Sequence, residues 1–329
     1  MPHHATIKAA AALAASLLAL PAGAGPARAA TRAPAHPSAG TGAAIVTTTP
    51  SAKVGGLPIS SLDGTVAYVP APGTGTTSQG PGTAAGPLPP TPFGDVYTAG
   101  ATGFDISWPQ CGGALPPDSA VAIVGADDGH PFSTNPCLHR EAAWSAAATR
   151  AQVLVLDSPI GWSTPRVLQY AYHGPAGDCA ATDYVCQCVN WGANAVDFAL
   201  RYADSEGATS PTWWMDIELP ASTSIDPSGA SCYAPDFWVC DHRLNSLVIA
   251  SALGELVAQG KTAGVYSTRE QWADITGGLF LGVPTWIAGY NHEPAVYCDP
   301  AKADAYWFGG GRPWLVQSLP AGYDPDTAC

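Results

Sequence analysis

Short apolar runs of strand length alternate with longer amphipathic segments in the C-terminal part of the chain. Most of the short runs are almost continuously apolar, which is typical of parallel strands that are buried on both faces. They span residues 102–107, 120–125, 151–156, 212–217, 263–267, 284–288 and 313–317. The alternation predicts parallel strands joined by crossover helices.

The clearest predicted helix spans residues 241–259, where leucine, valine and alanine recur every three to four residues before Gly260. Further helices are predicted at residues 138–149, 190–205 and 268–275. The number of strands suits a closed barrel of about eight strands better than an open sheet, with one strand still unassigned. The predicted fold is therefore α/β, an irregular TIM-type (β/α) barrel.

The N-terminal part of the chain lacks this alternation. An apolar stretch follows Lys8, and small residues then lead to an A-x-A pattern at residues 27–29, which predicts a signal peptide over residues 1–29. Residues 30–98 are rich in Pro, Gly, Thr, Ala and Ser and poor in aromatics, so a disordered linker is predicted there. The folded barrel is expected at residues 99–329.

Charge and hydropathy narrow the possible partners and location. The net charge is −13 with 13 Lys and Arg spread over the chain, too few and too scattered for nucleic acid to be a partner. No segment after the signal offers the roughly 18 uncharged apolar residues of a membrane span. We expect a secreted monomer, extracellular or associated with the cell wall, with no membrane insertion after signal cleavage.

All nine cysteines lie within residues 111–329, and in an exported protein this usage favours disulfides over metal thiolates. Proximity in the expected fold predicts four bridges and leaves Cys186 unpaired. The predicted pairs are Cys111 with Cys137, Cys179 with Cys188, Cys232 with Cys240, and Cys298 with Cys329. The choice of partner among Cys179, Cys186 and Cys188 stays open at this point.

Polar residues follow most of the predicted strands where the apolar runs stop. They are Asp105, Asp127, Asp128, Asp157, Asp216, Glu218, Tyr266, Ser267, Tyr290, Asn291 and Gln317. In a parallel barrel these strand ends gather on one face, the face at which active sites are assembled. We therefore expect several carboxylates to converge there.

The pair Asp216 and Glu218 is the most informative part of this set. In an extended strand, residues two apart point to the same face, so both acids face one way and Ile217 faces the other. Burying either charge without a partner is costly, so the pair belongs at a strand end that opens onto solvent or substrate. One alternative is a solvated strand end paired with Lys or Arg. Another is a calcium or magnesium site at Asp127 and Asp128, although we predict no metal and no cofactor.

Clustered carboxylates repel, which raises the pKa of at least one and lets a proton donor and an ionised partner coexist near neutral pH. Glycosidic bond cleavage needs such a pair. Tryptophans near the strand ends offer faces on which sugars stack, although Trp213 and Trp214, within a strand, are more often core residues. No G-x-S-x-G elbow and no H-x-x-x-H pair occurs, so serine hydrolase and zinc hydrolase chemistry find no support.

Several of these segments resemble the motifs of the family 25 glycoside hydrolases, secreted lysozymes (N-acetylmuramidases) with an irregular β/α barrel. Residues 103–110 (GFDISWPQ) resemble the G-x-D-x-S-x-x-Q motif of that family's first strand, and residues 216–218 resemble its D-x-E motif. In the matching order, residues 124–129, 264–267, 286–290, 317 and 323–324 resemble the remaining strand motifs. The opening W-P-Q-C-G also resembles a group of secreted proteins of this type.

The resemblance implies a role for each matching residue. Glu218 would be the proton donor, Asp216 the companion carboxylate that positions an acetamido group or stabilises charge, and Asp105 a third catalytic acid. Substrate-binding roles would fall to Asp128, Tyr266, Trp286, Tyr290, Gln317 and Asp324. We therefore expect a secreted glycoside hydrolase that cleaves a β-1,4-linked amino-sugar polymer, with cell-wall peptidoglycan as its partner.

The chain also departs from the family pattern. The second-strand glutamate is replaced by Asp128, and the family's tyrosine-bearing third-strand segment reads Leu154 to Pro159 here. Cysteine-bearing insertions near residues 176–189 and 228–240 flank the expected cleft. The alternative is a catalytically silent barrel that binds carbohydrate or cell wall.

Overall fold

The computed structural model describes residues 53–54, 57–58, 93–159, 165–219, 238–319 and 322–329. The predicted signal peptide, most of the predicted linker and Cys232 lie outside these ranges. Strands β1 (Lys53–Val54) and β2 (Leu57–Pro58) form a two-stranded antiparallel pair.

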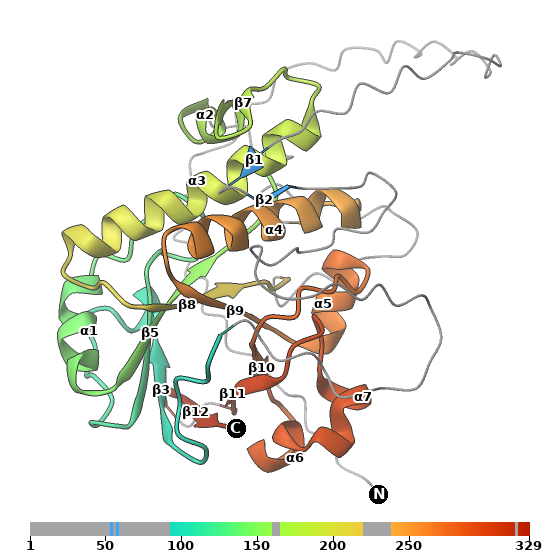
Figure 1. Ribbon diagram of the computed structural model, residues 1–329. Helices are drawn as coiled ribbons and strands as arrows, with labels where there is room; N and C mark the ends of the chain where they lie inside the picture. Colours follow the sequence, from blue (N-terminus) through green and yellow to red (C-terminus); the bar gives the residue numbers. More distant parts are fainter. Residues whose placement is uncertain (1–52, 55–56, 59–92, 160–164, 220–237, 320–321) are drawn as a thin grey trace, which may run out of the picture. The chain divides into compact units, whose positions relative to one another are not determined.

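Eight strands close into a barrel in the order β10, β11, β12, β3, β4, β5, β8, β9 (Figure 1). They are β3 (Thr102–Ile106), β4 (Val121–Gly125), β5 (Thr149–Val155), β8 (Thr212–Asp216), β9 (Thr262–Ser267), β10 (Thr285–Ala288), β11 (Pro313–Gln317) and β12 (Asp324–Ala328). The predicted α/β barrel is confirmed, and all seven predicted strands are present.

The eighth strand, β12, is the one that the sequence left unassigned. Its residues Asp-Pro-Asp-Thr-Ala lack the apolar run of the other strands. β12 is antiparallel to both of its neighbours, β11 and β3, whereas the other barrel pairs are parallel. The barrel is therefore mixed rather than fully parallel, and β12 brings its first residues to the end at which the parallel strands finish. We call this the carboxyl end of the barrel.

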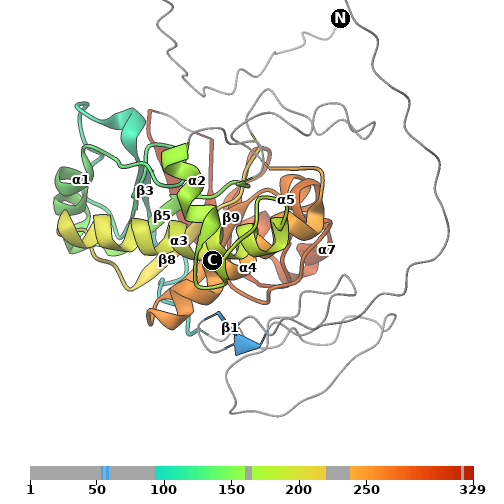
Figure 2. The same ribbon diagram turned by 90° about the horizontal axis from the view of Figure 1, so that it is seen from above.

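Helices cover the outside of the barrel (Figures 1 and 2). They are α1 (Leu138–Trp144), α2 (Pro165–Tyr172), α3 (Tyr184–Ser205), α4 (His242–Ala258), α5 (Arg269–Thr276), α6 (Pro294–Cys298) and α7 (Ala303–Tyr306). The predicted helix at residues 241–259 is confirmed, with Asp241 as the N-cap. α1 ends five residues before its predicted end because β5 begins at Thr149.

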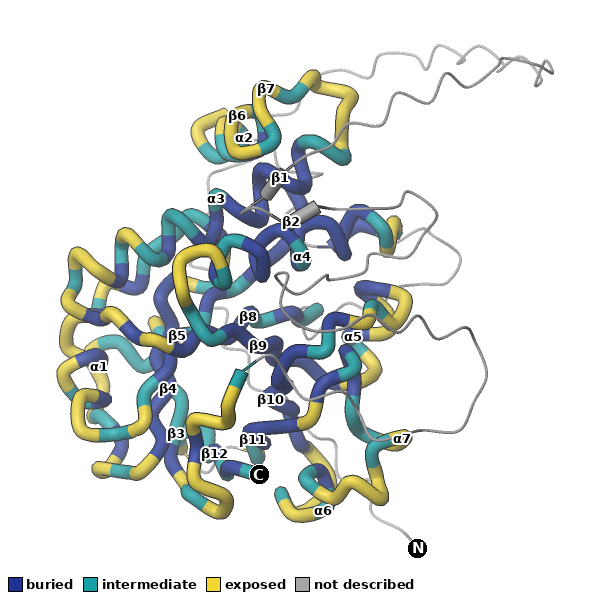
Figure 3. The backbone as a smooth tube through the Cα atoms, viewed as in Figure 1, coloured by how far each residue is buried: buried dark blue, intermediate teal, exposed yellow. Residues whose placement is uncertain are grey.

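Two apolar cores lie on the two sides of the barrel wall. Outward residues such as Trp213, Met215 and Ile217 pack with the helices. Inside the barrel, Trp214, Trp286 and Trp314 pack edge to face, with ring centroids 6.0 and 6.3 Å from Trp214. Figure 3 shows the strands buried and the solvent sides of the helices exposed. The indoles of Trp213 and Trp214 are therefore core residues, as the sequence favoured.

Close backbone approach explains two glycines. A Cβ on Gly264 of β9 would lie 2.3 Å from the Trp214 ring, so only glycine leaves room for that indole inside the barrel. A Cβ on Gly192 of α3 would lie 2.1 Å from the Val248 carbonyl oxygen of α4. α3 and α4 can therefore pack side by side against the barrel (Figures 1 and 2).

The amino end of the barrel is closed by residues that the sequence analysis places in the linker. Tyr97 is 6% exposed, packs against Trp314, and its hydroxyl accepts a hydrogen bond from Trp214 Nε1 at 3.2 Å. Arg312 binds Asp95 at 2.8 Å nearby. Residues 93–98 are thus described together with the barrel.

Disulfides Cys111–Cys137 and Cys298–Cys329 are formed as predicted. The predicted bridge from Cys179 to Cys188 is wrong, because Cys179 pairs with Cys186 and Cys188 is a buried free thiol. Cys188 follows Cys186 by two residues on α3 and faces the core, where burial raises its pKa to about 12. Cys240 is disulfide-bonded, but its predicted partner Cys232 lies outside the described residues.

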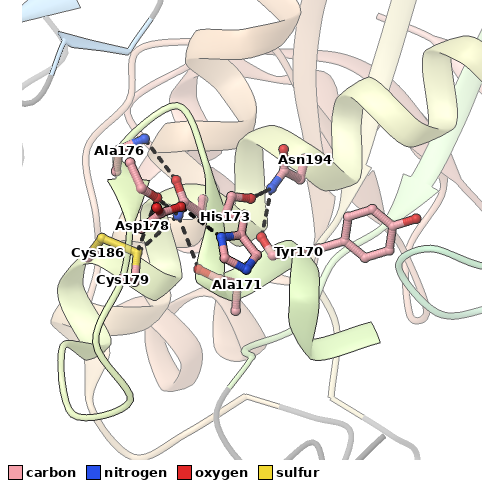
Figure 4. Close-up of polar contacts among 10 residues, drawn as sticks. Tyr170, Ala171, His173, Ala176, Asp178, Cys179, Cys186 and Asn194 are labelled. Carbon is pink, nitrogen blue, oxygen red and sulfur yellow. Dashed lines mark hydrogen bonds and ion pairs between the residues drawn. A yellow bond between two sulfur atoms is a disulfide. The ribbon is translucent and has the colours of Figure 1, made fainter. Parts of the chain in front are cut away.

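A small hairpin precedes α3 and is made of β6 (His173–Gly174) and β7 (Gly177–Asp178). The Cys179–Cys186 bridge joins the end of this hairpin to the start of α3. Figure 4 shows side chains of α3 reaching into this hairpin. Asn190, which is fully buried, accepts from the Ala176 amide and donates to the Ala171 and Gly177 carbonyls. Asn194 donates to the Tyr170 and His173 carbonyls. The insertion is therefore a tied, hydrogen-bonded unit.

Candidate active site

The segment from Asp216 to Glu218 continues beyond β8 in an extended form. The Ile217 amide donates to the Tyr266 carbonyl at 3.0 Å, and the Ile217 carbonyl accepts from Ser267 Oγ at 2.7 Å. Trp238 Nε1 donates to the Glu218 carbonyl at 3.1 Å. Ile217 is fully buried among the helix-facing residues, so the two acids on either side of it face the barrel interior at its carboxyl end.

The antiparallel strand β12 brings two more acids to the same place. Asp324 lies directly opposite Asp105 in the register of β12 and β3. Asp326 lies two residues further along the same face, opposite Gln317 of β11. Asp326 is 1% exposed, whereas Asp105 and Asp324 are partly exposed.

Hydrogen bonds connect these acids to neighbouring strands. Tyr266 donates its hydroxyl to Gln317 Oε1 at 2.7 Å, and Gln317 Nε2 donates to Asp105 Oδ2 at 2.9 Å. Trp286 Nε1 donates to Asp326 Oδ1 at 2.8 Å. Side chains from β3, β9, β10, β11 and β12 are thereby held in one polar network.

Six carboxyl groups act on one another electrostatically at this end of the barrel. They are Asp105, Asp127, Asp216, Glu218, Asp324 and Asp326, which we call the acidic cluster. Among the described residues, no ion pair includes a member of the cluster. Burial and mutual repulsion therefore act on these acids without a neutralising Lys or Arg.

The result is a set of strongly raised pKa values. Burial, with a smaller contribution from the Asp324 charge, raises the pKa of Glu218 to about 7. Burial first, and the Asp324 charge second, raises the pKa of Asp105 to about 8. The pKa of Asp216 is raised well above its ordinary value by burial and by the Glu218, Asp127 and Asp105 charges. Several protons are thus retained near neutral pH.

Asp216 Oδ1 is buried and has no hydrogen-bond partner within the described part of the chain. A buried polar atom of this kind costs free energy unless a ligand or water satisfies it. The oxygen belongs to a group that faces Glu218 and Asp105.

The aromatic residues predicted to bind substrate differ in exposure. Tyr290, just after β10, is 46% exposed, and the charges of Glu218 and Asp216 raise its pKa in addition to burial. Tyr266 is buried and faces the cluster. Trp286 is only 2% exposed and packs on Tyr266 with ring centroids 4.4 Å apart. In this structure its indole packs inside the barrel and donates a hydrogen bond to Asp326.

The second strand contributes Asp127 rather than Asp128 to the cluster. Asp127 is buried, and its carboxylate accepts from the Gly129 amide at 3.1 Å and the Val155 amide at 2.7 Å. Burial raises its pKa to about 7. Asp128 is exposed, and the structure does not bring it into the cluster. Asp157 instead accepts from Trp191 Nε1 of α3.

Asp326 and Asp127 belong to the cluster but are not among the predicted catalytic or substrate-binding residues, and the substrate-binding role of Asp128 stays a prediction. Asp326 gave no signal because its strand was not recognised. Asp127 could have been found from the period of β4, since Ile123 faces the barrel interior and residues 125 and 127 follow on its side. Among the described residues, no group of three or more His, Cys, Asp or Glu is arranged to hold a metal ion.

Comparison with known proteins gives a partial match. A curated protein from Dictyostelium discoideum named "Probable GH family 25 lysozyme 2" is 26% identical over 114 residues. The match covers 34% of this chain and 46% of that protein, so the chain spans less than half the length of the relative. The motifs that resemble family 25 lysozymes are thus accompanied by a partial match to a curated protein that carries this family's name. No family model matches the sequence.

Among solved structures, the catalytic domain of endolysin ply40 from bacteriophage P40 of Listeria monocytogenes aligns over 71% of this chain and 95% of its own. The TM-score is 0.39 and the sequence identity 13%. Of the described helices, none is long and apolar enough to cross a membrane.

Proposed function

We propose that the protein is a glycoside hydrolase that cleaves a β-1,4-linked amino-sugar polymer, with cell-wall peptidoglycan as the substrate. The observation that carries the proposal is the position of Glu218. It is an acid with a pKa near 7 that faces Asp105 and Asp216 at the carboxyl end of a closed barrel. The partial match to a relative named as a family 25 lysozyme supports the same chemistry.

In this proposal, Glu218 protonates the leaving glycosidic oxygen. With a pKa of about 7, about half of the Glu218 carboxyls carry a proton at neutral pH, which suits a general acid. The ordinary pKa of glutamate, about 4.3, would leave almost none protonated. Burial of the side chain is thus what makes Glu218 a proton donor.

Asp216 would contact the sugar beside the scissile bond. Burial and the neighbouring charges raise its pKa well above the ordinary value, which favours the protonated form, and a protonated carboxyl can donate one hydrogen bond and accept another from the neutral acetamido group of an amino sugar. The free Oδ1 atom supports this assignment. Asp105 and Asp324 would supply the negative charge that stabilises an oxocarbenium-like transition state as they ionise.

Exposed Tyr290 is our candidate for a direct sugar contact at the rim, since a tyrosine ring stacks on a sugar face and its hydroxyl hydrogen-bonds. Tyr266, Gln317 and Trp286 would hold the acids in place through the network described above. Asp128 lies outside the acidic cluster, and we propose a substrate contact for it only at the periphery.

We further propose that the protein acts outside the cell. Disulfides Cys111–Cys137, Cys179–Cys186 and Cys298–Cys329 form and persist in oxidising compartments. Peptidoglycan is also extracytoplasmic, so the proposed location and substrate agree.

The test is release of new reducing ends from purified peptidoglycan by the full-length protein and by Glu218→Gln. We expect release by the wild type and a loss of roughly 10²- to 10⁴-fold in the variant, because Gln cannot donate the proton. Glu255→Gln on α4, away from the cluster, is the matched control and should act like the wild type. Borohydride reduction followed by acid hydrolysis identifies which amino sugar carries the new reducing end.

The alternative is a barrel that binds the polymer without turnover. The changed second and third strands favour it, since Asp128 is exposed and Asp157 is directed toward α3. Binding of peptidoglycan by wild type and Glu218→Gln alike, with no reducing ends from either, would support this reading and contradict the hydrolase.

A further inference from the structure

Asp326 is a buried acid that the proposed reaction does not use. It lies on β12 between β11 and β3 and is 1% exposed. Its Oδ1 atom accepts from Trp286 Nε1, whereas Oδ2 is buried and receives no hydrogen bond from any donor in the described part of the chain. An unsatisfied carboxylate oxygen at such a position would be costly.

The group that faces Asp326 is another carboxyl. Asp326 and Asp105 lie diagonally across the paired strands β12 and β3, since Asp324 is opposite Asp105 and Asp326 is opposite Gly103, and each acts on the pKa of the other. The other titratable groups that act on Asp326 or its partner are Asp324 on β12, Asp216 and Glu218 at the end of β8, Tyr266 on β9, and Tyr97 at the amino end. None of them is cationic, so two ionised carboxylates would face one another in a buried site without compensation.

A proton between the two carboxyls removes this conflict. Asp105 already accepts from Gln317 Nε2, and no such donor reaches Asp326 Oδ2. Asp326 is also the more deeply buried of the pair. The proton therefore belongs on Asp326 Oδ2, from which it is donated to Asp105.

We infer that Asp326 is a positioning residue of the acidic cluster, a neutral carboxylic acid that donates from Oδ2 to Asp105 while Trp286 fixes its other oxygen. Asp105 is then held by two donors, Gln317 from β11 and Asp326 from β12. Its role in catalysis rests on the proposed hydrolase function, but the protonation of Asp326 does not.

An asparagine at position 326 reproduces the proposed arrangement. Its amide nitrogen can donate to Asp105 from the position of Oδ2, and its oxygen can accept from Trp286. Alanine removes both contacts. Asp326→Asn should therefore behave like the wild type in kcat if Asp326 acts as a neutral donor, and like Asp326→Ala if Asp326 acts through its negative charge.

The first measurement is the melting temperature of the full-length protein from pH 4 to pH 8, which requires no activity. An aspartate that keeps its proton when folded destabilises the fold increasingly as pH rises above about 4, because the unfolded chain loses that proton. We expect the melting temperature of Asp326→Asn to rise relative to wild type across this range. Asp304→Asn, an exposed change of equal charge on α7, is the control for net charge.

The second measurement is the rate of reducing-end release. We expect Asp326→Asn to stay within about threefold of wild type, and Asp326→Ala to lose roughly tenfold or more in kcat with little change in KM. If Asp326 had only a structural role, the folded Asp326→Asn and Asp326→Ala variants would not differ in kcat. Melting curves establish that each variant is folded before its rate is compared.

The outcomes separate the two proposals. If wild type releases nothing but the melting difference still grows with pH, the hydrolase proposal fails and the protonated Asp326 stands. If wild type is active but the melting difference stays at that of Asp304→Asn, the inference about Asp326 is overturned. Equal loss of kcat in Asp326→Asn and Asp326→Ala would overturn its positioning role.

Discussion

Burial, more than any single partner, sets the chemistry of the acidic cluster. It is the largest cause of the raised pKa of Asp105, Asp127 and Glu218. Each unit of pKa corresponds to ~1.4 kcal/mol between the two protonation states, so such acids are unlike any exposed carboxylate on the same chain. The acidic cluster thus keeps several protons bound at neutral pH.

A pH–rate profile tests this at the level of one residue. If Glu218 is the proton donor, kcat/KM should fall as pH rises through about 7, because Glu218 then loses its proton. The measurement is reducing-end release from peptidoglycan between pH 4 and pH 9. A profile that is flat or rising through pH 7 would exclude Glu218 as the general acid.

What the sequence could reveal about the site depended on strand context. Asp216 and Glu218 end a recognisable apolar run, so their shared direction followed from the strand period. Asp127 and Asp128 are adjacent and face opposite ways, and only the register of β4 decides between them. Cys186 and Cys188 posed the same difficulty on a helix, where two residues separate an exposed face from the core.

At the scale of elements, the hairpin before α3 is held by the side-chain amide of the buried Asn190. Asn190 Nδ2 lies 3.1 Å from the Ala171 carbonyl and 2.9 Å from the Gly177 carbonyl, and Oδ1 lies 2.8 Å from the Ala176 amide. Removal of the side chain would leave the carbonyl of the buried Ala171 without this donor and would also remove the bonds to the less buried Ala176 and Gly177.

We therefore expect Asn190→Ala to lower the free energy of unfolding by roughly 2 to 4 kcal/mol, measured by chemical denaturation. The partly exposed Asn194 is the matched comparison, and Asn194→Ala should cost about 1 kcal/mol because water can replace its contacts. An Asn190→Ala loss no larger than that of Asn194→Ala would contradict the role of this amide.

Elements with a strong apolar period were predicted well, and the polar strand was not. The helix α4 carries leucines and valines on the face that it buries, and its capping aspartate precedes it. β12 carries two acids and a proline, and one of its two neighbours, β3, lies far away in sequence. Its strand character comes from its neighbours rather than from its own residues.

For the whole molecule, the retained protons link stability to pH. Acids whose pKa is raised on folding stabilise the folded state fully below about pH 4, and this contribution is lost as pH rises toward their folded values. Those values are about 7 for Asp127 and Glu218 and about 8 for Asp105. The protein should therefore be more stable in mild acid than in mild alkali.

We expect the melting temperature to fall by at least ~5 °C between pH 5 and pH 8, as measured by calorimetry. Glu218→Gln removes one of the contributing acids, so its melting temperature should fall less over the same range. A melting temperature that is constant or rises between pH 5 and pH 8 would show that these acids are ionised in the folded protein.

The antiparallel strand β12 also determines the point in synthesis at which the barrel can close. β12 fills the gap between β11 and β3, and its first residue pairs with Asp105, which lies 324 − 105 = 219 positions earlier. A nascent chain that ends at Gln317 has seven barrel strands and neither Asp324 nor Asp326. Such long-range pairing forms late, so closure of the barrel and completion of the acidic cluster coincide. An incompletely synthesised chain would therefore lack one strand of the barrel wall together with Asp324 and Asp326, two of the six acids of the cluster.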